Sequence, residues 1–134
     1  DGQFRLYRHA VNPDLPGLGL VGFNTSFATI LTSELIANWL VRFADGQLID
    51  QPDDDTMRDS IRVLEEWRKN ERPAALAYGG LCVAPFHYRH MDELLADMGA
   101  AKRSSANPLT EYLSYPRAGK FRAYLDSAPQ YVAG

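Results

Sequence analysis

The chain has 134 residues, of which 46% are hydrophobic and 23% are charged, the ordinary range for a single globular domain. With 14 basic and 17 acidic residues its net charge is −3, which argues against the basic face that a nucleic-acid partner needs. The sequence contains no run of ~18 apolar residues that could span a membrane. The single cysteine, Cys82, excludes an internal disulfide and favours a cytoplasmic protein with a buried thiol. A start at Asp1, without a signal peptide, is what a fragment or a processed product would show.

Two short strands are predicted near the N-terminus. Apolar and polar residues alternate over residues 4–8, and residues 18–23 form a short apolar run typical of a buried strand. Residues 12–17 between them have the composition of a turn, because Pro presets φ and Gly accepts positive φ.

The clearest element is a helix predicted over residues 26–44. Its apolar residues recur at helical spacing and cover more than one stripe, which predicts burial on most sides. These residues include Phe27, Ile30, Leu31, Leu35, Trp39 and Phe43. Residues 45–46, Asp-Gly, are expected to end the helix with Gly in the left-handed conformation.

Two more helices are predicted downstream. Residues 54–70 have one apolar and one charged face, an acidic start suited to the helix dipole, and Pro73 as a stop. A shorter helix is expected over residues 90–98, with Gly99 after it. Prolines break the tail at 100–134, but its aromatic residues predict an irregular segment that wraps over a surface.

Catalytic motifs are nearly absent, since neither a Gly-rich dinucleotide fingerprint nor a phosphate-binding loop occurs. His87 and His90 have a spacing compatible with a metal site, but partly exposed histidines at a helix start explain them better. The acidic run at 53–55 is better explained as a helix start than as a metal cluster. Ser26 and the pair at 104–105 have no His base nearby in the sequence, which disfavours a hydrolase triad.

One junction could bind a ligand. The second predicted strand ends at Gly22, the small polar residues Asn24, Thr25 and Ser26 follow, and a long helix then begins. Free N–H groups and partial positive charge at a helix N-terminus suit an anion or an electron-rich ligand edge. The alternative is a plain strand–turn–helix connection with a capping Ser.

The same region resembles a known family. Leu-Tyr-Arg-His at 6–9, Asn-Pro-Asp-Leu-Pro-Gly-Leu-Gly at 12–19, and Leu-Val-Gly-Phe at 20–23 resemble the late segment of flavin-containing monooxygenases. The similarity covers residues 4–46 most clearly and residues 57–99 more loosely. It implies enzymes that use NADPH to reduce FAD and insert oxygen through a flavin hydroperoxide.

The resemblance also implies a division of the chain. Residues 1–46 would end a Rossmann-like FAD domain, and residues 47–134 would form a helical C-terminal extension, together one α+β, helix-dominated domain. The cofactor-facing segment would comprise Gly22, Phe23, Asn24, Thr25 and Ser26. Because both nucleotide fingerprints are missing, we expect no bound FAD or NADPH here, no catalytic residues, and association with the parent's remaining domains or with itself. The alternative is a stand-alone helical binding or interaction domain.

Overall fold

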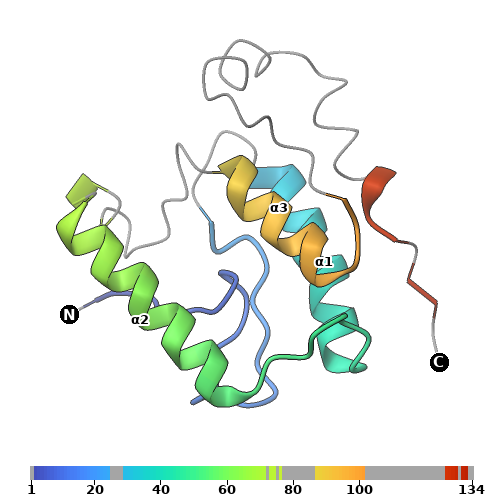
Figure 1. Cartoon of the computed structure of the whole chain (residues 1–134), viewed down its shortest axis with the longest axis horizontal. Coiled ribbons are helices and arrows are strands. Elements are labelled where there is room, and N and C mark those ends of the chain that lie inside the picture. The colour runs from blue at the N-terminus through green and yellow to red at the C-terminus, as the bar shows by residue number, and fades with distance from the viewer. Residues whose placement is uncertain are drawn as a thin grey trace, which may run out of the picture.

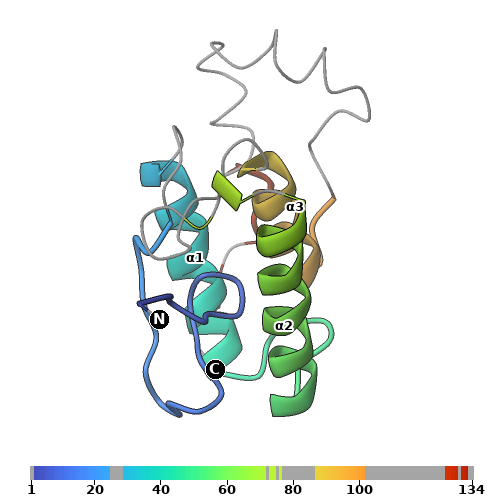
Figure 2. The same cartoon turned by 90° about the vertical axis from the view of Figure 1, so that its left-hand side faces the viewer.

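A computed structural model describes residues 2–24, 29–71, 73–74, 76, 87–101, 126–129 and 131–132. Its helices are α1 (Thr29–Ala44), α2 (Asp54–Asn70) and α3 (His87–Asp97). α1 packs against α3, while α2 lies apart from that pair (Figure 1). The N-terminal loop contacts α2 through Arg5 and α3 through Arg8, and the turned view in Figure 2 shows the loop beside α2. The helix-dominated part of the fold prediction is therefore confirmed.

α2 has the predicted bounds, and its first turn explains the acidic run. The side chain of Asp53 accepts a hydrogen bond from the backbone N–H of Thr56 at 2.8 Å and caps the helix. Asp54 and Asp55 form ion pairs with Arg58. The helix-start interpretation of the acidic run is confirmed by this cap.

The other two helices differ from prediction at their starts. The described part of α1 begins at Thr29, because residues 25–28 lie outside the described residues, and Gly46 ends it with φ +66°. α3 begins at His87, three residues earlier than predicted, and Gly99 follows it with φ +82°. None of the helices that can be described is long and apolar enough to cross a bilayer.

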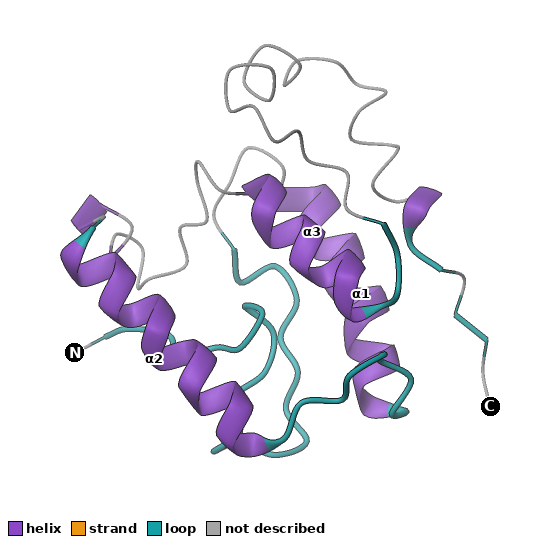
Figure 3. Ribbon diagram, viewed as in Figure 1, coloured by secondary structure: helices purple, strands orange, loops and turns teal. Residues whose placement is uncertain are grey.

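The predicted strands at 4–8 and 18–23 are reduced to isolated bridges, Tyr7 with Val11 and Val11 with Gly19; no strand occurs within the described residues (Figure 3). The cause of the first difference is local. Arg8 and His9 take φ of 51° and 54°, so the chain turns back on itself where an extended strand was expected. The backbone N–H of Tyr7 then bonds to the carbonyl of Val11 at 2.8 Å.

The core lies between α1, α3 and the N-terminal loop, and it also includes Met57 of α2. Leu35, Ile36 and Trp39 of α1 are fully buried, as are Met91, Leu94 and Leu95 of α3. The expectation that α1 is buried on most sides is wrong for one face, because Ile30 is 81% exposed and Val41 42% exposed. Among the described residues, α3 and the N-terminal loop, through Tyr7, pack on other faces of α1.

Two described residues of the tail, Pro129 and Tyr131, contact the C-terminal end of α1 and the residue after it. Arg42 donates to the carbonyl of Pro129 at 2.7 Å, and the hydroxyl of Tyr131 donates to Asp45. The predictions for Cys82 and for the serines at 104–105 fall outside the described residues.

Candidate functional site

Asp97 at the end of α3 joins three parts of the chain. Its Oδ2 accepts from Nε of Arg8 at 2.8 Å and from the indole Nε1 of Trp39 at 2.9 Å, and its Oδ1 accepts from Nη2 of Arg8 at 3.0 Å. The Arg8–Asp97 contact is therefore a two-pronged fork, the strongest geometry for this pair. It fixes the N-terminal loop to α3 and α1 at one point.

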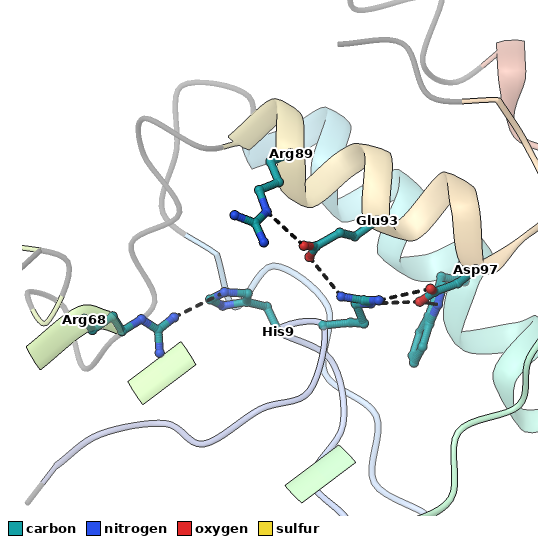
Figure 4. A network of polar contacts seen from close by, with 7 residues as sticks. His9, Arg68, Arg89, Glu93 and Asp97 are labelled. Atoms are coloured by element: carbon teal, nitrogen blue, oxygen red, sulfur yellow. Dashed lines mark hydrogen bonds and ion pairs between the residues drawn. The ribbon is translucent and has the colours of Figure 1, made fainter. Parts of the chain in front are cut away.

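The fork continues along α3. Nη1 of Arg8 donates to Glu93 at 2.9 Å, and Glu93 also accepts from Arg89 one turn earlier at 3.2 Å (Figure 4). Burial lowers the pKa of Arg8, but the hydrogen bonds and charges of Asp97 and Glu93 outweigh it and leave this pKa raised. Arg8 is therefore a permanent cation in this network.

Aromatic rings surround the fork. The guanidinium of Arg8 lies 4.9 Å from the ring centre of Tyr7, which is tilted against Trp39 at 6.0 Å. Trp39 stacks on Phe43 at 5.0 Å. Burial raises the pKa of Tyr7, so its hydroxyl stays neutral near pH 7. The apolar rings shield the ion pair from water on this side.

Two histidines and an arginine form a second buried group. Nη2 of Arg68 on α2 lies 3.3 Å from Nε2 of His9, and the rings of His9 and His90 meet edge to face at 5.1 Å. Burial and the charge of Arg68 lower the pKa of His9 to about 4. Burial, with the charges of His9, Arg8 and Arg68, lowers the pKa of His90 well below its usual value. Both rings are neutral at pH 7.

The structure describes Gly22, Phe23 and Asn24 of the predicted cofactor-facing segment, whereas Thr25 and Ser26 lie outside the described residues. Gly22 takes φ +84°, a conformation that L side chains rarely adopt. Phe23 packs edge to face on Phe4 with ring centres 5.3 Å apart.

Asn24 is the unusual member of this segment. It is 2% exposed, yet neither Oδ1 nor Nδ2 of its side chain has a hydrogen-bond partner among the residues that the structure describes. An unsatisfied buried amide costs free energy, so it calls for an explanation. One carbonyl and one NH₂ group side by side can pair with a ligand edge that alternates acceptors and donors.

Sequence reasoning missed the role of Arg8, His9 and Asp97. In the sequence, Leu-Tyr-Arg-His at 6–9 indicated only a family resemblance and a strand pattern. The available signal was two basic residues inside an apolar stretch, which is costly to bury unless partners exist. Their partners on α2 and α3 are at least 59 residues away in sequence.

Comparison with known proteins supports the resemblance. Over 114 residues, 84% of this chain, it is 32% identical to the protein named probable flavin-containing monooxygenase 1 of Arabidopsis thaliana. Over 100 residues it is 27% identical to flavin-containing monooxygenase 2 of the same plant, whose name is equally provisional. The chain spans about a fifth of the length of each. No family model matches the chain, and neither does any solved structure.

These matches relate the chain to flavoprotein oxidoreductases of the monooxygenase type. More narrowly, the chain corresponds to one portion of a flavin-containing-monooxygenase-like protein, which confirms the resemblance stated from residues 6–23.

Proposed function

We propose that the chain is the C-terminal region of an FAD- and NADPH-dependent monooxygenase and forms the closing edge of its Rossmann-like FAD domain. Residues 1–46 would complete that domain, and residues 47–134 would form the helical extension. FAD, when bound, supplies the redox chemistry of oxygen insertion. The parent's remaining domains would hold its adenine and pyrophosphate and bind NADPH in a cytoplasmic enzyme.

The observation that carries the proposal is Asn24. Its buried amide lacks partners within the described part of the chain, and the pyrimidine edge of a flavin presents alternating carbonyl and N–H groups that such an amide can pair with. Gly22, with its positive φ, lets the backbone turn without a side chain in the way. Phe23, between them, rests on Phe4 and cannot swing freely. These residues would bind and orient the ring; the N-terminus of α1, just beyond them, would favour negative charge there.

The test compares one substitution in two settings. In the 134-residue chain, Asn24→Leu removes an unsatisfied buried amide, so stability should be unchanged or slightly increased. In the longer protein that includes the nucleotide fingerprints, the same change should weaken FAD retention by about 10-fold or more, since it removes hydrogen bonds worth roughly 1–3 kcal/mol. Asn12→Ala, in the surface turn where Asn12 bonds to the N–H of Asp14, is the matched control. Unchanged FAD retention in the Asn24 variant would remove the basis of the proposal.

Two further expectations concern the chain alone. Purified without its parent it should be colourless, and a flavin absorbance band near one per chain would contradict that. It should also self-associate, because one face of α1 with Ile30 and Val41 is exposed. Light scattering that gives the mass of the 15.0 kDa monomer at every concentration would instead favour a stand-alone domain.

A further inference from the structure

His9 and His90 sit where three elements meet. His9 comes from the N-terminal loop, His90 from α3, and Arg68 from α2. His9 is 5% exposed and His90 7% exposed, so neither ring is hydrated to any extent. Figure 4 shows His9 and Arg68 joined beside the Arg8 network.

The contact with Arg68 requires a neutral His9. A guanidinium can only donate, so Nε2 of His9, 3.3 Å from Nη2 of Arg68, acts as an acceptor. The ring proton is thereby assigned to Nδ1. A second proton on Nε2 would place two donors and two positive charges face to face. Protonation of His90 is also unfavourable. Its Nε2 is buried and has no hydrogen-bond partner among the described residues, so a proton added there would have no acceptor.

The charged groups around the two histidine rings disfavour their protonation. Arg68 faces the pair from α2, and Arg8 faces it from the loop. On α3, the carboxylates of Glu93 and Asp97 are already engaged by Arg8. Asp92, buried on the same helix, makes interactions of its own. One added proton would thus enter a group that already holds two guanidinium cations.

The turn that carries His9 has an unfavourable backbone conformation. Arg8 and His9 both hold positive φ, which costs energy for residues other than Gly and persists only while contacts enforce it. The His9 ring also hydrogen-bonds to the backbone of Phe23, so the position of the ring is coupled to the segment 22–24.

We infer that the His9–His90 pair is a proton-sensitive latch, which holds the turn at residues 7–11 against Arg68 of α2 when neutral and loosens that contact when protonated, while the Arg8–Asp97 pair keeps the turn on α3. The latch requires no flavin and stands whether or not the segment 22–24 binds one. Where that segment does bind a ligand, release at low pH would loosen it through Phe23.

The direction of the pH effect follows from proton linkage. The pKa of His9 is lower in the folded state, about 4, than its ordinary 6.5, so the folded state is favoured most above pH 6.5. Stability is lost as the pH falls from 6.5 toward 4. For His9 alone, the unfolding equilibrium constant should rise by about 10²-fold between pH 7.5 and pH 4.

The first test measures urea unfolding of the 134-residue chain against pH. His9→Gln and His90→Gln remove the titrating rings and should each flatten the pH dependence between pH 7.5 and pH 4. His87→Gln, which removes the third histidine, should leave it as in the wild type. A wild-type dependence in both pair variants would overturn the inference.

The second test needs no substitution to fold. In the native chain with ¹³C-labelled histidine, the ring signals of His9 and His90 should titrate well below 6.5. Hydrogen-exchange protection should fall at the amides of Tyr7, Ala10 and Val11 as these rings titrate, before it falls in the interior of α2. A ring of the pair that titrates near 6.5 in the folded chain, or loss of protection in α2 together with residues 7–11, would refute the latch.

Discussion

Removal of the Asp97 carboxylate is the most severe single change that the structure predicts outside the apolar core. Asp97→Ala deletes both prongs of the Arg8 fork and the acceptor of the Trp39 indole N–H. The side chains of Asp97 and Arg8 are only 17% and 19% exposed, so water replaces these bonds poorly. Glu93 remains and relieves part of the cost. Loss of one partner of a buried ion pair costs roughly 3–5 kcal/mol, and this retained partner places the expected loss at about 2–4 kcal/mol.

The assay is urea unfolding followed by tryptophan fluorescence and circular dichroism. Asp97→Asn keeps an acceptor for Trp39 but loses the charge, so it should fall between the wild type and Asp97→Ala. Asp59→Ala is the control, because Asp59 is 74% exposed and pairs with Arg62 on the surface of α2. Such exposed pairs contribute about 0–1 kcal/mol. If Asp97→Ala costs no more than Asp59→Ala, the fork does not anchor the loop.

Other substitutions test the core and the turns. Leu35→Ala, at a fully buried position of α1, should lower the free energy of unfolding by about 2–5 kcal/mol. Ile30→Ala, at an 81% exposed position, should lower it by under ~0.5 kcal/mol. Equal losses of stability in thermal melts would contradict the packing of α1. Gly99→Ala should destabilise more than Gly17→Ala, although both have positive φ, because only at Gly99 would the new Cβ meet Ile49, at 2.8 Å. Chemical denaturation of the two variants side by side checks that order.

The helices were predictable because their signals are local. The cap at Asp53, the apolar face of α2 and the positive-φ residues Gly46 and Gly99 all act within a few residues of where they stand. The start of α3 was placed three residues late because no capping residue marks it. The exposure of Ile30 could not be read from periodicity, since a wide apolar surface does not say which neighbours are present to cover it.

The candidate site was predictable only in part. The resemblance pointed to residues 22–26, and the described members of that segment include a buried amide that needs a partner. The Arg8, His9 and Asp97 contacts were not predictable, because each joins residues at least 58 apart in the sequence. A basic residue in an apolar segment indicates that a partner exists but does not identify it.

The ion pair explains how the N-terminal loop holds its position without a sheet. Residues 7–19 have only isolated bridges among the described residues, so no ladder of hydrogen bonds sets their register. Apolar packing alone tolerates sliding, because one Leu replaces another at little cost. The two-pronged contact between Arg8 and Asp97 does not tolerate such sliding, because a shift of one residue would leave a buried charge unpaired. The fork therefore supplies specificity more than net stability, and it places the turn at 7–11, with His9 and through it Phe23, at one fixed point against α2 and α3.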